Sequence, residues 1–196
     1  VPRNYSVDEN ADIYLGGSCD PTTWRLDVSM PLCELHGVTY YNPQVDDWRP
    51  ELVAIEAKAK EEASLLFFVI DNATRAIGSM LEAAEYIGRG RRVVVVIQEM
   101  DQTGPVKVGK DLLPPAEIKD LTRARRFLKD VAQRAGVPCY SGPDAIVLAM
   151  QDAIARCNGR VEMAAATEHD ATIERLQQLG EHIMKEATID VTSPLF

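Results

Sequence analysis

Two short runs of uninterrupted apolar residues place the strongest constraint on the fold. Leu65–Ile70 reads LLFFVI, and Val93–Ile97 reads VVVVI. A strand with one solvent-exposed face alternates polar and apolar residues, whereas a strand covered by helices on both faces is apolar throughout. We therefore predict that both runs are buried strands of a parallel sheet, with helices packed on its two faces.

Helical patterns alternate with strand patterns along the chain, as in a sheet wound with crossover helices. Three further strands are predicted at Ile13–Leu15, Val38–Tyr41 and Pro138–Tyr140. Helices are predicted to begin at Asp20-Pro21 and at Gly78-Ser79, and to run over 50–63, 118–135 and 143–157. This order predicts an α/β, Rossmann-like (βα)5 three-layer sandwich with a parallel sheet and right-handed crossovers.

The pattern divides the chain into two parts. Residues 1–159 hold the alternating strands and helices, and residues 160–196 are expected to form a C-terminal helical extension with a flexible tail. Within this extension, 172–185 carries apolar residues at helical spacing and is predicted to be an amphipathic helix, packed on the domain or on a partner subunit. The sequence begins at Val1 rather than Met, as a piece of a longer protein would.

Charge and cysteine usage narrow the class of function. The chain has 30 Asp and Glu residues against 21 Lys and Arg, and its net charge of −9 argues against binding nucleic acid or a membrane surface. No apolar run reaches transmembrane length, and no stretch has the pattern of a signal peptide. Four widely spaced cysteines without a CxxC pair favour reduced thiols in a cytoplasmic protein, and the nucleus is also compatible. Three scattered histidines form no Cys/His cluster, so neither a metal nor a cofactor is predicted.

The first strand runs into Gly16-Gly17-Ser18, and this loop is the first candidate for ligand binding. Glycines let a ligand approach the backbone closely, and a helix that begins at Asp20-Pro21 would offer free N–H groups to an anionic or sugar-phosphate ligand. The alternative is an ordinary strand-to-helix turn. The spacing does not match the GxGxxG dinucleotide fingerprint. Ligands of open parallel sheets bind at the carboxyl ends of the strands, where Asn42–Trp48 and Asp71–Ser79 also lie.

Glu82 is the strongest candidate for chemistry, because it lies one turn into the helix that follows the central strand. A carboxylate there can attack an anomeric carbon and form a glycosyl–enzyme ester. The alternative is a capping box, in which Glu82 and Ser79 satisfy the N–H groups of the helix start. Asp71, at the end of a buried strand, would either hold a sugar hydroxyl or cap a turn.

Three other groups have a binding and a structural interpretation. Asp47 beside Trp48 suits recognition of a base or ribose, but equally suits a helix cap beside a packed aromatic ring. Trp24-Arg25 is expected to be a core tryptophan whose neighbouring arginine pairs with Asp46 or Asp47. The basic residues of the 118–135 helix are expected to form a solvated face rather than a phosphate site; they are Arg123, Arg125, Arg126 and Lys129.

These residues together resemble the nucleoside 2-deoxyribosyltransferase-like family over roughly residues 12 to 98. The motifs that carry the resemblance are Gly16-Gly17-Ser18-Cys19, Thr23-Trp24-Arg25, Tyr41-Asn42-Pro43 and Asp47-Trp48. Within the family, the sequence looks most like a metazoan branch of developmental signalling regulators. The resemblance implies homo-oligomers, such as a homodimer, in which neighbouring subunits complete each site.

The resemblance also implies roles for single residues. Glu82 stands eight residues before Gly90-Arg91, which is where the family has its nucleophile, and Tyr14 matches the tyrosine that positions it. Two further family carboxylates, which hold the sugar and assist proton transfer to the leaving base, fall at Ser64 and Ala76. Their loss predicts weak turnover, because general acid catalysis is typically worth about 10²–10⁴-fold.

Three functions remain open on this evidence. The favoured one is a regulatory, weakly active or inactive family member that binds a nucleoside or nucleotide-like ligand in signalling. Such a member would also bind signalling proteins as partners. The second is an active deoxyribosyltransferase or nucleoside hydrolase that uses Glu82, and the third is a protein-interaction scaffold. The predicted catalytic residues are Glu82 and Tyr14. The predicted substrate-binding residues are Gly16, Gly17, Ser18, Asn42, Asp47, Trp48, Asp71 and Ser79.

Overall fold

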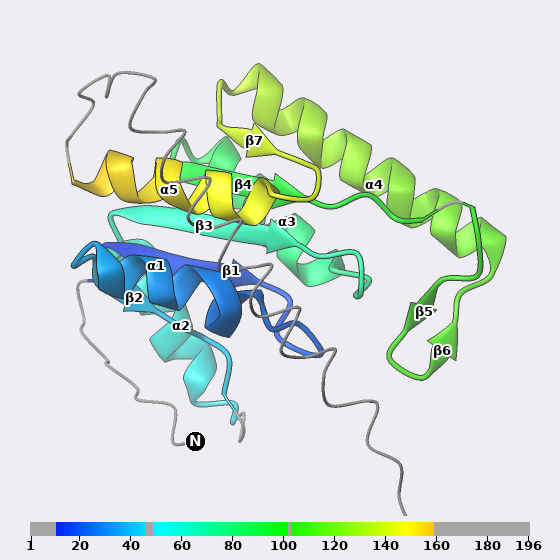
Figure 1. The fold of residues 1–196 in the computed structure, drawn as a ribbon, viewed down its shortest axis with the longest axis horizontal. Coiled ribbons are helices and arrows are strands. Elements are labelled where there is room, and N and C mark those ends of the chain that lie inside the picture. Colours follow the sequence, from blue (N-terminus) through cyan, green and yellow to red (C-terminus); the bar gives the residue numbers. More distant parts are fainter. Residues whose placement is uncertain (1–10, 46–48, 102, 159–196) are drawn as a thin grey trace, which may run out of the picture. The chain divides into compact units, whose positions relative to one another are not determined.

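A computed structural model describes residues 11–45, 49–101 and 103–158. Its main sheet has five strands in the order β2-β1-β3-β4-β7, and every neighbouring pair is parallel (Figure 1). The strands are β1 (Ile13–Gly17), β2 (Tyr40–Tyr41), β3 (Leu65–Ile70), β4 (Val93–Ile97) and β7 (Cys139–Tyr140). The predicted α/β Rossmann-like fold with a parallel sheet is confirmed.

The two apolar runs form adjacent strands near the middle of the sheet. All residues of β3 and β4 are buried, and their register pairs Leu66 with Val93 and Ile70 with Ile97. Successive side chains of a strand point to opposite faces, so each run contributes side chains to the two cores on either side of the sheet. Leu66 and Phe68 belong to one core, whereas Leu65 and Phe67 belong to the other. Burial of both faces explains why neither strand alternates with polar residues.

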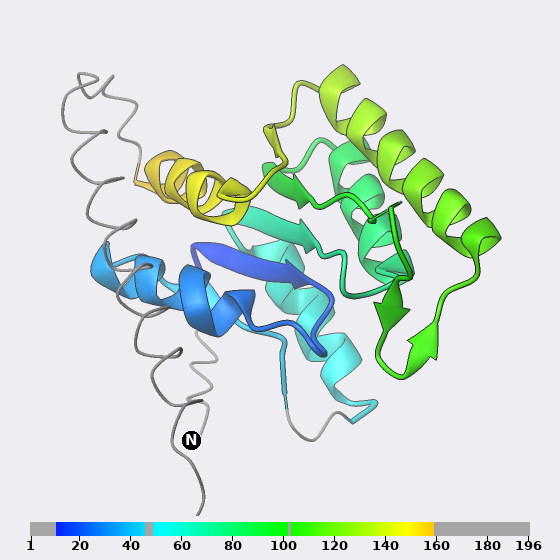
Figure 2. The same cartoon turned by 45° about the vertical axis from the view of Figure 1, so that its right-hand side comes forward.

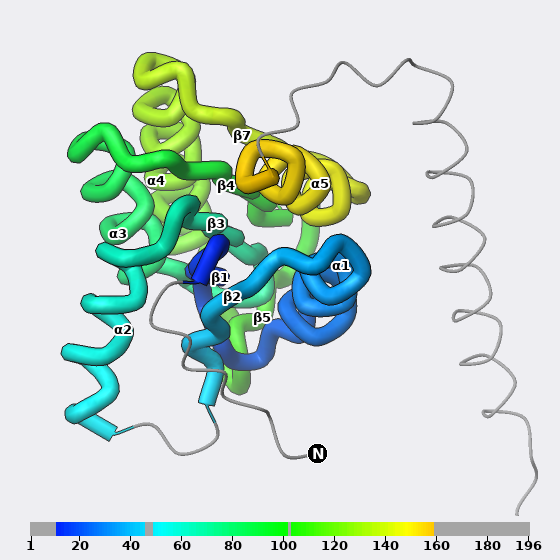
Figure 3. Tube along the Cα trace, turned by 90° about the vertical axis from the view of Figure 1, so that its left-hand side faces the viewer, coloured from blue at the N-terminus to red at the C-terminus, as the bar shows by residue number. Residues whose placement is uncertain are grey.

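Helices cover both faces of the sheet, as Figure 3 shows along the strands. One layer contains α2 (Leu52–Glu62), α3 (Ile77–Gly88) and α4 (Pro115–Arg134). The other layer contains α1 (Met30–Leu35) and α5 (Ala145–Cys157). A five-residue π-helical turn, η1 (Arg25–Ser29), leads directly into α1.

The first helix begins later than the sequence predicts. The Asp20–Pro21 peptide bond is cis and lies in a turn closed by the Thr22 N–H, which donates to the Cys19 carbonyl at 3.0 Å. The Thr22 hydroxyl also donates to the carbonyls of Ser18 and Cys19, each at 2.8 Å. These bonds hold the chain in a turn, so the prediction that Asp20-Pro21 starts the helix is wrong.

The segment between β4 and α4, predicted as a long loop, contains a small antiparallel hairpin. Its strands are β5 (Lys107–Val108) and β6 (Asp111–Leu112), joined through Gly109, whose φ of 59° favours glycine. A separate apolar cluster fixes this segment to α4; it contains Met100, Val106, Leu113, Ile118 and Leu121. The hairpin therefore lies at the N-terminal end of α4 (Figure 2).

The helix expected over 172–185 lies outside the described residues, as does the tail. Among the described helices, none combines the length and the apolar character that crossing a membrane requires.

Candidate functional site

The glycine pair of β1 is required by the packing of the sheet. A Cβ on Gly16 would lie 2.5 Å from Cε1 of the Phe68 ring. A Cβ on Gly17 would lie 2.3 Å from the carbonyl oxygen of Val69, and the φ of Gly17 is 118°. L-residues with side chains rarely adopt that angle. The close approach that these glycines permit is thus the approach of β1 to β3.

Arg25 holds the end of β1 and the loop that follows it. Its Nε donates to the Leu15 carbonyl at 3.0 Å, and its Nη1 and Nη2 donate to the carbonyls of Ser18 and Gly17, both at 2.8 Å. The side chain is buried, its guanidinium carbon lies 4.2 Å from the centre of the Trp24 ring, and burial lowers its pKa. The sequence predicted a structural role for this residue; the acids expected to pair with it, Asp46 and Asp47, lie outside the described residues.

Arg125 binds the backbone that follows β3 and β4, as Arg25 binds the backbone at the end of β1. Its Nη2 donates to the carbonyls of Asp71 and Thr74 at 2.8 and 2.9 Å, and its Nε donates to the Gln98 carbonyl at 3.1 Å. Only 2% of Arg125 is exposed, and burial lowers its pKa to about 10. The prediction of a solvated face is therefore wrong for this residue. Its spacing of four residues after Leu121 and three before Leu128 was the signal of an inward position.

The loops at the carboxyl ends of the strands are also joined to one another. The Thr74 hydroxyl donates to Ser18 Oγ at 2.9 Å, which links the loop after β3 to the glycine loop. Asn42 Oδ1 accepts the Gln44 N–H at 3.0 Å, and Gln44 Nε2 donates to the Cys19 carbonyl at 2.8 Å. The structure thus brings Ser18 and Asn42 into one bonded framework. The role of Gln44 in this framework was not predicted from the sequence.

Asp71 lies at this edge, where its carboxylate accepts the N–H of Ala73 at 2.6 Å. This bond is the turn-capping arrangement considered for Asp71. The other candidates of this edge, Asp47 and Trp48, lie outside the described residues.

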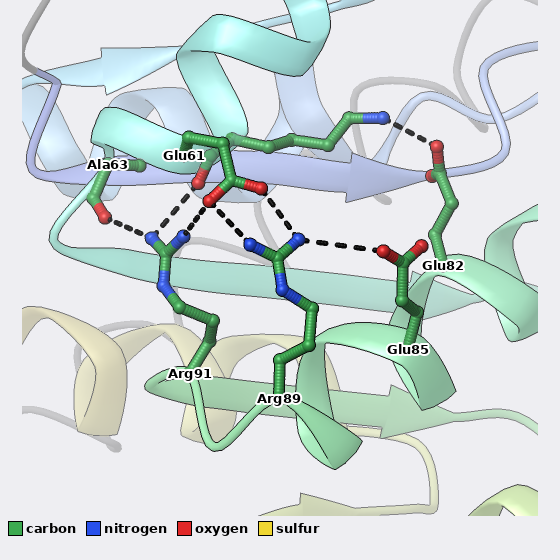
Figure 4. A network of polar contacts seen from close by, with 7 residues as sticks. Glu61, Ala63, Glu82, Glu85, Arg89 and Arg91 are labelled. Carbon is green, nitrogen blue, oxygen red and sulfur yellow. Dashed lines mark hydrogen bonds and ion pairs between the residues drawn. The ribbon is translucent and has the colours of Figure 1, made fainter.

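Glu82 forms an ion pair with Lys60 across the gap between α3 and α2. Lys60 Nζ lies 2.5 Å from Glu82 Oε1. A dashed line at the labelled Glu82 marks this ion pair in Figure 4. The Lys60 residue is only 8% exposed, whereas 41% of the Glu82 side chain faces solvent. The carboxylate is therefore accessible from outside, although one of its oxygens is held from the protein side.

The capping box proposed for Glu82 does not form. The helix begins at Ile77, one residue before the predicted start at Gly78-Ser79, and Ala76 occupies the capping position in a left-handed conformation with a φ of 53°. Ser79 therefore lies within the first turn instead of at the cap, and no side-chain cap is present. The structural alternative for Glu82 and Ser79 is wrong, and Glu82 has a tertiary partner instead.

Tyr14 lies beside this ion pair. Lys60 Nζ is 5.5 Å from the centre of the Tyr14 ring, and Tyr14 stacks on Tyr41 with a ring separation of 5.5 Å. The residue is 2% exposed. Burial raises the pKa of Tyr14 well above its usual range, and the charges of Glu56 and Glu82 raise it further. The structure thus brings together Tyr14 and Glu82, the two residues predicted to be catalytic.

Glu56 is a second carboxylate of this site that the sequence analysis missed. It lies one helical turn before Lys60, and burial is the main cause of a raised pKa for its carboxyl group. The Lys60 charge lowers that pKa, whereas the Glu82 charge raises it. Glu and Lys residues four apart on a helix usually form a solvated pair, but Lys60 is buried. The paired Lys58 and Glu62, 3.7 Å apart, do form such a surface pair.

A network of arginines fixes the end of α2 against α3 (Figure 4). Arg91 Nη2 donates to the carbonyls of Lys60 and Ala63 at 3.0 and 2.8 Å. Glu61 lies 2.6 Å from Arg89 and 3.1 Å from Arg91. Because Arg91 binds the backbone of Lys60 itself, this network sets the position from which the Lys60 ammonium group reaches Glu82.

The arrangement fits a known family. A family model described as nucleoside 2-deoxyribosyltransferase like matches residues 10–100. This segment belongs to the nucleoside 2-deoxyribosyltransferase-like family. No curated protein matches the chain.

The matched segment contains β1, α2 and α3, and so the whole of the Tyr14, Lys60 and Glu82 cluster. Ser64 is exposed, and Ala76 lies at the start of α3 with 7% of its surface exposed. Neither residue supplies a carboxylate to this nucleoside 2-deoxyribosyltransferase-like domain. The described residues hold no group of three or more His, Cys, Asp or Glu side chains placed to bind a metal.

Proposed function

We propose that this nucleoside 2-deoxyribosyltransferase-like domain binds a nucleoside or nucleotide-like ligand with little or no turnover. The observation that carries the proposal is the ion pair between Glu82 Oε1 and Lys60 Nζ at 2.5 Å. Attack of Glu82 on an anomeric carbon would convert its carboxylate into a neutral ester. The buried Lys60 charge would then lose its partner, and an uncompensated buried charge is costly.

The acid–base chemistry of the site supports the same conclusion. Cleavage of an N-glycosidic bond needs a proton at the leaving base, and the two positions where the family has carboxylates hold Ser64 and Ala76. Binding needs only shape and a few polar groups. Arg25 and Arg125 brace the loops that would present those groups. A domain that binds without consuming its ligand is suited to a regulatory role in signalling.

An active N-glycosidic enzyme is the second candidate, and Glu56 is the observation that favours it. Burial raises the pKa of its carboxyl group, and a carboxyl group with a raised pKa is suited to donate a proton to a leaving group. In this scheme Glu82 forms an ester with the sugar C1′ as the C1′–N bond breaks. Glu56 then supplies the proton to the base nitrogen, and water or a second base releases the sugar from Glu82.

The two candidates are separated by incubating the protein with deoxynucleosides, nucleosides, nucleotides and NAD. Base release is followed by chromatography and binding by thermal shift, for the wild type, Glu82→Ala and Glu56→Gln. The proposal predicts a thermal shift with at least one compound and no release above the Glu82→Ala level. Release that both substitutions abolish would establish the enzyme. Absence of both release and shift would leave the scaffold as the function.

Self-association is part of the same proposal. Two apolar residues of α3, Ile77 and Leu81, are 55% and 68% exposed; they lie one turn apart, and both precede Glu82 in the helix. Light scattering at micromolar concentration should give a mass above that of the monomer, and Leu81→Arg should lower it. Leu112→Arg is the matched control, since Leu112 is 60% exposed on the β5–β6 hairpin. A monomeric wild type would refute this part of the proposal.

A further inference from the structure

A hollow lies along α4, apart from the residues around Glu82. It has a volume of about 510 Å³ and is bounded by α4 and the segment that leads into it. Its lining residues are Gly104, Pro115, Ile118, Lys119, Thr122, Arg123 and Arg126. The β5–β6 hairpin lies at the same end of the helix (Figures 1 and 2).

The rim of this hollow is cationic. Lys119, Arg123 and Arg126 follow one another at spacings of four and three residues, which places them on one side of the helix. None of the lining residues is acidic. Arg123 already pairs with Asp120 at 2.6 Å, whereas no ion pair to Lys119 or Arg126 is found within the described part of the chain. Two cations thus face the hollow unneutralised in a protein whose net charge is −9.

The acids nearest this end of α4 are engaged elsewhere. Arg75 Nε lies 2.6 Å from Glu117, and Arg75 Nη2 lies 3.3 Å from Asp111 of the hairpin. One arginine of the β3–α3 connection therefore binds both carboxylates. Within the lining of the hollow itself, Lys119, Arg123 and Arg126 face no acidic residue.

The helix that carries the cations is held in place. Arg125, the neighbour of Arg126, is buried and donates to the carbonyls of Asp71, Thr74 and Gln98. The lining of the hollow includes the apolar residues Pro115 and Ile118, and the Thr122 hydroxyl is satisfied by the Ile118 carbonyl at 2.8 Å. A lining that combines apolar and cationic side chains suits a ligand that joins an apolar group to an anionic one.

We propose that this hollow is a binding site for small organic phosphates. Lys119 and Arg126 contact the phosphate, because a guanidinium and an ammonium group both form charge-assisted hydrogen bonds with phosphate oxygens. The apolar part of the ligand rests on Pro115 and Ile118. The site is separate from the proposed nucleoside site, since the two share no residue.

Calorimetric titration with phenyl phosphate tests this inference, because phenyl phosphate carries neither a ribose nor a nucleobase. We expect binding at low ionic strength that is tighter than binding of inorganic phosphate and that weakens as salt is added. The double substitution Lys119→Ala, Arg126→Ala should lower the affinity by about tenfold or more, as expected for the loss of charge-assisted bonds. Both side chains are exposed, and unchanged urea unfolding would verify that the variant folds.

Arg134→Ala is the matched control. Arg134 lies on the same helix, outside the hollow, and pairs with Asp130 at 2.9 Å. It should leave the affinity for phenyl phosphate unchanged, as should Glu82→Ala, which tests the nucleoside site separately. The inference is overturned if phenyl phosphate does not bind, if it binds no more tightly than inorganic phosphate, or if Arg134→Ala weakens binding as much as the double substitution.

Discussion

Replacing Gly17 by alanine tests whether the glycine pair serves the sheet or a ligand. The added Cβ would lie 2.3 Å from the Val69 carbonyl oxygen, which belongs to the backbone of β3 and cannot rotate away. Overpacking of this kind typically costs about 1–3 kcal/mol. The φ of 118° adds about 1–2 kcal/mol for a residue with a side chain. We therefore expect Gly17→Ala to lower the free energy of unfolding by about 3 kcal/mol.

Gly78→Ala is the matched control, with the opposite expected sign. Gly78 lies in α3, and a Cβ there would meet nothing within 4 Å. Alanine in a helix is more stable than glycine by about 0.5–1 kcal/mol, so this variant should be slightly stabilised. Urea unfolding, monitored by circular dichroism, gives both values. For a domain of this size, the Gly17→Ala loss corresponds to a fall in Tm of about 6–12 °C.

Two results would refute this reasoning. If Gly17→Ala changed stability by less than about 1 kcal/mol, the predicted clash with β3 would be absent. If it preserved stability but abolished the thermal shift caused by nucleosides, the glycine would serve the approach of a ligand instead.

Three further predictions follow from buried charged groups and thiols. Arg125→Met should lower the free energy of unfolding by about 2–3 kcal/mol, because three carbonyls lose their donor. Arg134→Met, on the exposed side of α4, should change the free energy of unfolding by less than about 0.5 kcal/mol. Similar urea midpoints for the two variants would contradict this prediction. The pKa of Glu56 is raised in the folded protein, so its carboxyl group lowers the stability of the protein as pH rises from the unfolded pKa through the folded pKa. Glu56→Gln should therefore be more stable than wild type at pH ~7 but not at pH ~4. An equal difference in urea midpoint between the two proteins at both pH values would refute the raised pKa. Burial raises the pKa of the Cys33 thiol to about 12, so Cys33 should not react with Ellman's reagent at pH ~8 until urea unfolds the protein. Mass spectrometry of the labelled peptides would show which cysteines react. Rapid labelling of Cys33 in the folded protein would contradict its buried position.

The sequence predicted the sheet well because its signal is local. Leu65–Ile70 and Val93–Ile97 are apolar at every position, and only a strand buried on both faces requires this. The start of the first helix was missed because it depends on the Thr22 hydroxyl, which closes a turn with Ser18 and Cys19. Such side-chain bonds compete with a helix start and are not visible in hydrophobic spacing.

The candidate site was predicted in part for the same reason. Glu82 and Tyr14 follow from their places in the strand and helix pattern and from the family resemblance, and the structure places both beside Lys60. The role of Lys60 is a tertiary property, because its partner lies on another helix, 22 residues away in sequence. Charged residues such as Lys60 and Arg125 are ordinarily assigned to the surface, and only their contacts with particular groups explain their burial.

The rate of base release from 2′-deoxynucleosides, followed by chromatography, tests the central claim most directly. The wild type, Glu82→Ala and Glu82→Gln are compared under the conditions in which the wild type shows a nucleoside-dependent thermal shift. The account predicts that the wild type, with Glu82 paired to Lys60, releases base no faster than either variant. Release by the wild type that both substitutions abolish would contradict it, and would establish Glu82 as the nucleophile of a working enzyme.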